Sequence, residues 1–241
     1  MNQKEVLQIL AKLGAVITDS HIVYAAGNHG TAYVNKDAVY PDTVETKALC
    51  QAMAEMFADS GAEVVVGPEK GGIILSQWTA YHLTNLTGKM VAAVYAEREE
   101  RSVLKATVGT PFFVERLGNF NLYPGEELLV REPKFIFKRG YGQQVAGKKV
   151  LVVEDVLTTG GSAAKTVEAV RLAGGKVVGL GVLCNRGGVT SDMVGNTRLQ
   201  ALVNLTLESW PEVECPLCAK NVPINIEVGK GKAFLARMGQ A

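Results

Sequence analysis

The sequence predicts an α/β fold, a mostly parallel sheet with helices on both faces. Short, almost continuously apolar runs rich in valine alternate with segments that carry apolar residues at helical spacing. Strands that are apolar on both faces are typical of parallel sheets buried between two layers of helices. With 241 residues, the chain is long enough for one such domain with additions.

The alternation of strands and helices can be followed along the chain. Turn and cap signals bound the segments: Asp42 precedes the second helix as an N-cap, and Gly174 and Gly175 end the last one. We expect strands at residues 62–67, 90–96, 148–154, 176–183 and 201–207. We expect helices at residues 6–13, 43–57, 73–86 and 162–172.

Two parts of the chain depart from this alternation. Residues 97–144 are charged and contain Gly-Thr-Pro and Tyr-Pro-Gly turn signals, which favours an extended β-hairpin, here called the flap. From Trp210 the composition changes to a segment with proline and two cysteines, here called the tail. We therefore expect a domain over residues 1–209, with the flap inserted in it, and the tail over residues 210–241.

Bulk composition excludes several classes of protein. A hydrophobic content of 47% with 20% charged residues is typical of a globular protein rather than a disordered one. The formal net charge of +1 argues against a general nucleic-acid binder. The start of the chain does not resemble a signal peptide, and no run of ~18 apolar residues predicts a membrane span. Four scattered cysteines are too few for a disulfide framework, so we expect a reduced, cytoplasmic protein.

The strand at 148–154 leads into the strongest candidate for a binding site. It ends in Glu154 and Asp155, and a Thr-Thr-Gly-Gly-Ser turn follows before the next helix. Backbone N–H groups at a helix start lack intrahelical partners and favour anions, and paired glycines let a phosphate approach closely. The acids can accept hydrogen bonds from the vicinal hydroxyls of a ribose. The alternative is an ordinary polar strand end with a Ser/Thr cap.

The sequence EDVLTTGGS resembles the phosphoribosyl pyrophosphate (PRPP) motif of the type I phosphoribosyltransferases. The resemblance implies the fold of that family, with an N-terminal hood and a mobile flap. It covers nearly the whole chain apart from residues 101–133. It implies that the acids bind the ribose hydroxyls, with Asp155 also catalytic, and that the loop binds the 5′-phosphate. The implied PRPP-binding residues here are Glu154, Asp155, Val156, Leu157, Thr158, Thr159, Gly160, Gly161 and Ser162.

Two further segments resemble parts of the same family. Lys70, Gly71 and Gly72 follow the strand at 62–67 and resemble its pyrophosphate loop; a plain turn is the alternative. Arg98, at one arm of the flap, and Lys138 and Arg139, at the other, resemble its catalytic hairpin, which implies that they face pyrophosphate. About forty residues separate Arg98 from Lys138, more than is usual in the orotate enzymes. This spacing leaves open which of the three basic side chains is catalytic. A solvated charged hairpin is the alternative.

The choice of base depends on two other segments. Residues 25–42 resemble the orotate-enzyme segment that contacts the base, which implies that Tyr33 and Val34 stack on it; alanines replace its lysine, and His29 stands where a basic residue is usual. Arg186 resembles the family's strand-end arginine and, with Thr158, is implied to bind the base. A guanidinium pairs bidentately with a carboxylate, which orotate has and purine bases lack. A surface ion pair is the alternative for Arg186.

The resemblance therefore implies that PRPP and orotate give orotidine 5′-monophosphate and pyrophosphate, a step of pyrimidine synthesis. It also implies Mg²⁺ carried mainly by PRPP rather than by protein ligands, and a homodimer. Transfer to another base and a non-catalytic PRPP-sensing regulator remain open alternatives.

The tail contains ECPLCAKNVPI, which resembles the C-terminal signature of the Thermus-type orotate phosphoribosyltransferases. Cys215 and Cys218 form a C-x-x-C pair, and two interpretations are open: a buried structural pair, or half of a zinc site. Zinc needs two more ligands, from Cys50, Cys184, the three histidines or a partner subunit.

Overall fold

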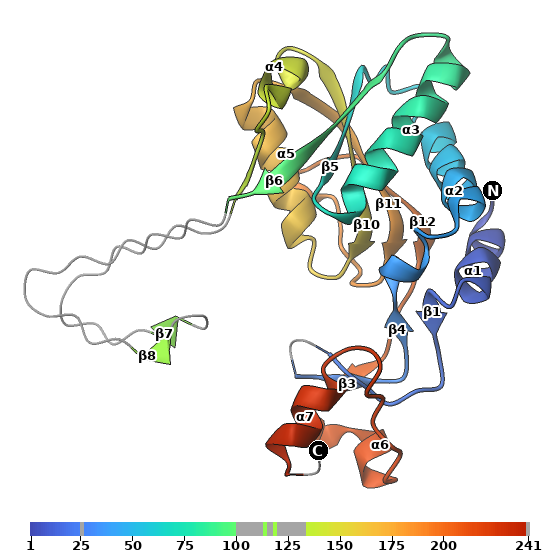
Figure 1. The fold of residues 1–241 in the computed structure, drawn as a ribbon, viewed down its shortest axis with the longest axis vertical. Helices are drawn as coiled ribbons and strands as arrows, with labels where there is room; N and C mark the ends of the chain where they lie inside the picture. The colour runs from blue at the N-terminus through green and yellow to red at the C-terminus, as the bar shows by residue number, and fades with distance from the viewer. Residues whose placement is uncertain (25–26, 100–112, 115–117, 120–133, 240–241) are drawn as a thin grey trace, which may run out of the picture.

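The centre of the molecule is a six-stranded sheet (Figure 1). The computed structural model describes residues 1–24, 27–99, 113–114, 118–119 and 134–239. The strand order is β12-β11-β10-β5-β6-β9, parallel from β12 to β6, with β9 antiparallel to β6. The strands are β5 (Val64–Pro68), β6 (Ala92–Arg98), β9 (Phe135–Ile136), β10 (Lys149–Leu157), β11 (Lys176–Asn185) and β12 (Leu199–Asn204). The predicted α/β fold and its five parallel strands are confirmed.

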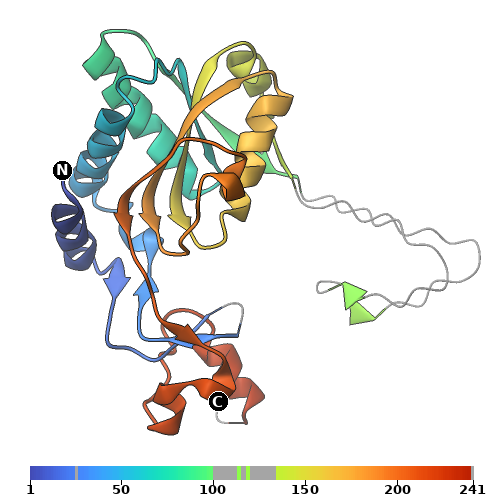
Figure 2. The ribbon, with the colours of Figure 1, turned by 180° about the vertical axis from the view of Figure 1, so that it is seen from behind.

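Helices cover both faces of this sheet because its central strand is apolar on both sides. In β10, Leu151 and Val153 belong to a core shared with α2 (Thr43–Met56) and α3 (Gly71–Thr87). Val150 and Val152 belong to a second core shared with α5 (Gly161–Leu172). Successive residues of a strand point to opposite faces, so one apolar run fills both cores. The helix α1 (Gln3–Lys12) adds to the first core and α4 (Tyr141–Val145) to the second (Figure 2).

The helix α2 begins where its sequence signal places it, whereas α1 and α3 begin three and two residues earlier than predicted. The Asp42 side chain accepts hydrogen bonds from the N–H groups of Val44 and Glu45, at 3.1 and 2.9 Å, and caps α2. Two helices follow directly on strands: α3 follows β5, and α5 follows β10. Both N-termini therefore lie at the C-terminal edge of the sheet, where ligands of parallel sheets bind.

A small lobe lies beyond that edge (Figures 1 and 2). It combines the tail with residues 13–41, here called the hood. The strands β2 (Ile22–Val23), β3 (His29–Gly30) and β13 (Ser209–Trp210) form an antiparallel sheet, and β1 (Val16–Ile17) pairs with β4 (Tyr33–Val34). The remaining short elements are η1 (Lys36–Ala38), η2 (Asp192–Val194), η3 (Glu212–Glu214), α6 (Pro216–Ala219) and α7 (Gly231–Arg237).

The tail is attached along β2 rather than standing apart from the domain. The N–H groups of Asn225 and Lys230 donate to the carbonyls of His21 and Val23, both at 2.8 Å. Residues near the two ends of the chain thus share one small sheet.

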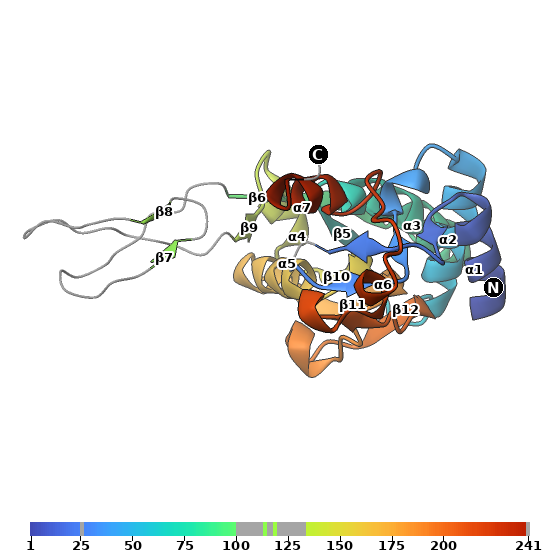
Figure 3. The same ribbon diagram turned by 90° about the horizontal axis from the view of Figure 1, so that it is seen from below.

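The flap begins with the predicted antiparallel pairing. Arg98 lies opposite Phe135, and Glu97 lies opposite Ile136, at the end of the molecule next to α4 (Figure 3). A second short pair joins β7 (Phe113–Val114) to β8 (Gly118–Asn119). The flap's two predicted turns, at residues 109–111 and 123–125, lie outside the described residues. In the described part of the chain, no helix is long and apolar enough to cross a membrane.

Candidate active site

The acid pair predicted to hold a ribose lies near the end of β10. Glu154 and Asp155 are both buried, at 5% and 3% exposure. Asp155 binds two residues of the hood: the Tyr40 hydroxyl donates to its Oδ2 at 2.9 Å, and the Lys36 ammonium lies 2.9 Å from the same oxygen. Neither partner is predicted from the sequence. The hood thereby reaches the acid pair from across the sheet edge.

These contacts fix the charge state of the two hood residues. Burial and the charges of Asp155 and Glu154 raise the pKa of Tyr40 far above its usual range, so its hydroxyl keeps its proton and donates. Burial alone would lower the pKa of Lys36, but the hydrogen bond and charge of Asp155 outweigh it and raise that pKa. Lys36 therefore stays cationic and offsets one negative charge of the pair.

Glu154 has a different environment from its neighbour. Burial, together with the nearby charge of Asp155, raises the pKa of Glu154 to about 8. Its Oε1 accepts from the N–H of Asp155 at 3.1 Å, whereas its buried Oε2 has no partner among the described residues. An unpaired buried oxygen is costly, and a hydroxyl donated by a ligand would satisfy it.

The turn after the acids forms a hollow at the start of α5. Its volume is about 150 Å³, and the lining consists of Glu154, Val156, Leu157, Thr158, Thr159, Gly160, Gly161, Ser162 and Ala163. Gly160 has φ of +76°, which favours glycine, and the helix begins at the next residue. Every residue of the predicted PRPP loop except Asp155 therefore lines one cavity at a helix N-terminus, where the helix dipole favours a phosphate.

The second predicted loop lies directly against the acid pair. A Cβ atom on Gly71 would be 2.0 Å from Asp155 Oδ2 and 2.4 Å from the Tyr40 hydroxyl. A Cβ atom on Gly72 would be 2.6 Å from Pro68 Cδ, so only glycine fits at either position. Lys70, just before them, is exposed, and the Glu69–Lys70 peptide bond is cis. The structure thus brings the two predicted loops side by side.

Two of the basic residues predicted in the flap share one acidic partner where the hairpin begins. Lys138 and Arg139 each lie 3.1 Å from an oxygen of Glu97, and Arg139 also donates to the Tyr95 hydroxyl at 3.1 Å. The backbone N–H of Arg98 donates to Glu69, in the second loop, at 2.8 Å. Arg98 therefore lies on β6 next to that loop, whereas Lys138 and Arg139 follow β9, with their side chains held by an acidic partner.

The residues predicted to bind the base are only partly brought together. Arg186 donates from Nε to the Thr158 hydroxyl at 3.0 Å, and its guanidinium lies 5.3 Å from the ring centre of Tyr24, in the hood. A Cβ atom on the next residue, Gly187, would be 1.6 Å from the Thr158 carbonyl oxygen, so β11 and the PRPP loop meet closely. This places a guanidinium beside the loop.

Tyr33 and Val34 do not share one face. They are successive residues of β4, so their side chains point to opposite sides, and Val34 packs in the first core. The prediction that both side chains stack on the base is therefore wrong for Val34. Stacking of Tyr33 on the base stays a prediction. His29 and His21 are buried rather than on the surface.

Comparison with known proteins places the chain in a family. Residues 42–193 match the model of the phosphoribosyl transferase domain. The chain belongs to the phosphoribosyltransferase family. A curated relative, orotate phosphoribosyltransferase of Desulforamulus reducens, is 32% identical over 223 residues, which cover 92% of this chain and 95% of the relative.

Two solved structures show the same phosphoribosyltransferase fold. Orotate phosphoribosyltransferase from Aeropyrum pernix matches with a TM-score of 0.56 at 20% identity, covering 98% of this chain and 99% of that one. The Mycobacterium tuberculosis orotate phosphoribosyltransferase, in complex with PRPP, matches with a TM-score of 0.51 at 19% identity, covering 84% and 89%. The match to the A. pernix structure extends over both the hood and the tail.

The raised pKa of Glu154 makes stability depend on pH. Its folded-state pKa of about 8 exceeds its ordinary value of 4.5, so in that window the folded protein holds a proton that the unfolded chain has lost. The contribution of this carboxyl to the free energy of unfolding therefore falls as pH rises from about 4.5 to 8. Glu154→Gln, which mimics the neutral acid, should match the wild type near pH 5 and have the higher Tm near pH 9.

Thermal unfolding of both proteins across this pH range checks the expectation. Glu168→Gln, at an exposed position of α5, serves as the control and should not show a pH-dependent gain. A Tm difference between Glu154→Gln and wild type that stays constant from pH 5 to 9 would contradict it.

Proposed function

We infer that this protein transfers the phosphoribosyl group of PRPP to orotate, giving orotidine 5′-monophosphate and pyrophosphate. The observation that carries the inference is the position of Arg186: its guanidinium is bound to Thr158 of the PRPP loop and lies over the Tyr24 ring. A planar cation beside the sugar-phosphate loop suits a base that carries a carboxylate. The identity to curated orotate enzymes over nearly the whole chain supports the same base.

The chain's own groups perform binding, orientation and charge stabilisation. Ribosyl C1 passes through an oxocarbenium-like state, as in glycosyl transfer generally. The carboxylate of Asp155 and the carboxyl group of Glu154 hold the ribose hydroxyls, and the amide groups of the loop hold the 5′-phosphate. With base and sugar held in line, the remaining task is to stabilise charge on the departing pyrophosphate.

The flap bases supply that stabilisation. Lys138 and Arg139 are paired with Glu97 in this structure, at the hairpin root beside the second loop. On binding of PRPP they exchange this carboxylate for pyrophosphate oxygens, and the flap excludes water that would hydrolyse the sugar.

We propose Mg²⁺ as the cofactor, carried mainly by PRPP oxygens and water. Mg²⁺ prefers hard oxygen ligands, and the acid pair with its unpaired Glu154 Oε2 is of that type, so the site fits the ion. When bound, Mg²⁺ neutralises pyrophosphate charge. The homodimer and the cytoplasmic location remain predictions.

The identity of the nucleobase is tested with a panel of bases and by removing the guanidinium of Arg186. Wild type with PRPP and Mg²⁺ should release pyrophosphate with orotate and not with adenine, hypoxanthine or uracil. Arg186→Ala should lower kcat/KM for orotate by roughly ten- to a hundredfold, the value of a charged hydrogen bond pair. Arg198→Ala is the matched control, because Arg198 also stacks on an aromatic ring, 5.2 Å from the centre of Phe57, at the C-terminal end of α2. Orotate activity that survives Arg186→Ala, or a preference for another base, would overturn the assignment.

The catalytic role of the flap is tested by replacing, one at a time, two lysines near the start of the hairpin. Lys138→Ala should lower kcat by roughly a hundredfold with little change in the Kd of PRPP, because it acts on charge that develops as pyrophosphate leaves. Lys134 also pairs with a flap glutamate, Glu99, at 3.4 Å, and its side chain is equally exposed. Lys134→Ala should keep wild-type kcat. Equal losses in kcat and in PRPP affinity for Lys138→Ala would assign it a plain binding role.

A further inference from the structure

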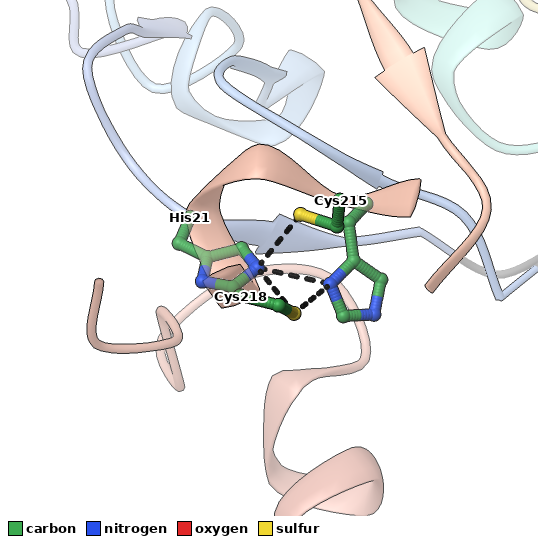
Figure 4. Close-up of side chains that lie close together, drawn as sticks. His21, Cys215 and Cys218 are labelled. Atoms are coloured by element: carbon green, nitrogen blue, oxygen red, sulfur yellow. Dashed lines mark hydrogen bonds between the residues drawn. The ribbon is translucent and has the colours of Figure 1, made fainter. Parts of the chain in front are cut away.

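The tail and the hood meet at four side chains that the reaction does not use. His21 and His29 come from the hood, and Cys215 and Cys218 come from the tail (Figure 4). One nitrogen or sulfur atom of each residue lies within 4.8 Å of the corresponding atom of every other. In the described part of the chain, this is the one such group of histidine, cysteine and acidic residues that could hold a metal ion.

The distances within this cluster are close to the edges of a zinc tetrahedron. A tetrahedral ion with Zn–N bonds of about 2.05 Å and Zn–S bonds of about 2.3 Å separates two nitrogens by roughly 3.3 Å, and nitrogen from sulfur by roughly 3.6 Å. His21 Nε2 lies 2.9 Å from His29 Nδ1. Cys215 Sγ and Cys218 Sγ lie 3.6 and 3.7 Å from His21 Nε2, and Cys218 Sγ lies 3.3 Å from His29 Nδ1.

The surroundings of His21 are those of a metal ligand. Its Nδ1 lies 2.7 Å from the carbonyl oxygen of Val222, an acceptor, so Nδ1 carries the proton and donates. The lone pair of Nε2 is then directed into the cluster, toward both sulfurs and His29. Ligating histidines generally donate their other nitrogen to a carbonyl or carboxylate in this way, which fixes the tautomer.

The composition of the cluster selects the kind of ion. Two thiolates and two imidazoles are soft and borderline ligands that suit Zn²⁺, whereas Mg²⁺ prefers oxygen. Four protein ligands leave no open position, which is typical of structural rather than catalytic zinc. Three of the four residues are buried, and Cys218 borders a groove of about 770 Å³ that gives an ion a route inward.

The tail also needs such a link, because it has no core of its own. Neither of the two hydrophobic cores contains a described residue beyond Leu207. Several apolar side chains of the tail are exposed instead, Val213 at 92% and Ile226 at 49%. Small units that cannot bury enough apolar surface are commonly stabilised by a metal or by disulfides.

We propose that His21, His29, Cys215 and Cys218 bind one structural Zn²⁺ ion that fastens the tail to the hood. The ion joins residues 194 positions apart, His21 and Cys215. This role is separate from transfer of the phosphoribosyl group. The proposal favours the zinc interpretation of the C-x-x-C pair, and it takes both missing ligands from the same chain.

Metal analysis of the full-length chain, purified under reducing conditions, tests the proposal. Elemental mass spectrometry should find about one zinc per chain. Cys215→Ser with Cys218→Ser, and separately His29→Asn, should abolish it. Cys184→Ala and His82→Asn are matched controls, since both replace a buried residue of the same type outside the cluster, and both should retain zinc.

Cobalt substitution of the chelator-treated wild type gives an independent readout that does not require the variants to fold. Co²⁺ should produce the intense visible bands of tetrahedral geometry and a thiolate charge-transfer band, and Zn²⁺ should displace it. Chelation should also lower the Tm, and Zn²⁺ but not Mg²⁺ should restore it. The proposal is overturned by a reduced chain without zinc that shows no tetrahedral cobalt spectrum, by a double cysteine variant that keeps its zinc, or by a Cys215–Cys218 disulfide that persists under the reducing conditions of purification.

Discussion

The site depends on the close approach of two turns at the C-terminal edge of the sheet. Asp155 Oδ2 occupies the space that a side chain on Gly71 would need, with a Cβ position only 2.0 Å away. The same oxygen binds Tyr40 and Lys36 of the hood. One carboxylate therefore joins the PRPP loop, the second loop and the hood. Apolar strands of β5 and β10 place the turns side by side, and the absence of a side chain at Gly71 lets them touch.

Charged side chains on both sides of this sheet edge are already paired with opposite charges. Lys36 offsets the acid pair, while Glu97 holds Lys138 and Arg139. A neutralised site avoids the large cost of burying isolated charge. Under the proposed function, PRPP brings hydroxyls to the acids and phosphate oxygens to the basic side chains, so its binding exchanges one set of charged partners for another. Such an exchange lets the site fold before it binds a strongly anionic substrate.

The sequence predicted what is encoded locally and missed what depends on tertiary contact. The strands, the cap at Asp42 and the two glycine turns are properties of short segments, and the structure has them. Lys36, Tyr40 and Tyr24 are ordinary residues of an irregular segment, and only folding brings them to Asp155 and Arg186. The position of Val34 was misjudged because the alternation of the short strand β4 was not recognised. The histidines and the C-x-x-C pair are visible in the sequence, but their contact is not, since spacing along the chain carries no signal over 194 residues.

His21 of the cysteine–histidine cluster and Tyr24 of the candidate active site flank one strand, β2. His21 directly precedes β2, and Tyr24 directly follows it, so the two are three residues apart in the hood. The tail hydrogen-bonds to the carbonyls of His21 and Val23 on the same strand. A constraint on His21 is therefore passed through β2 to the ring beneath Arg186. The PRPP loop instead belongs to β10 and α5, whose core contains no residue of the tail among those described. We therefore expect the fastening of the tail to bear on the Tyr24 side of the site more than on the loop after β10, which the sheet supports and the hood contacts through Asp155.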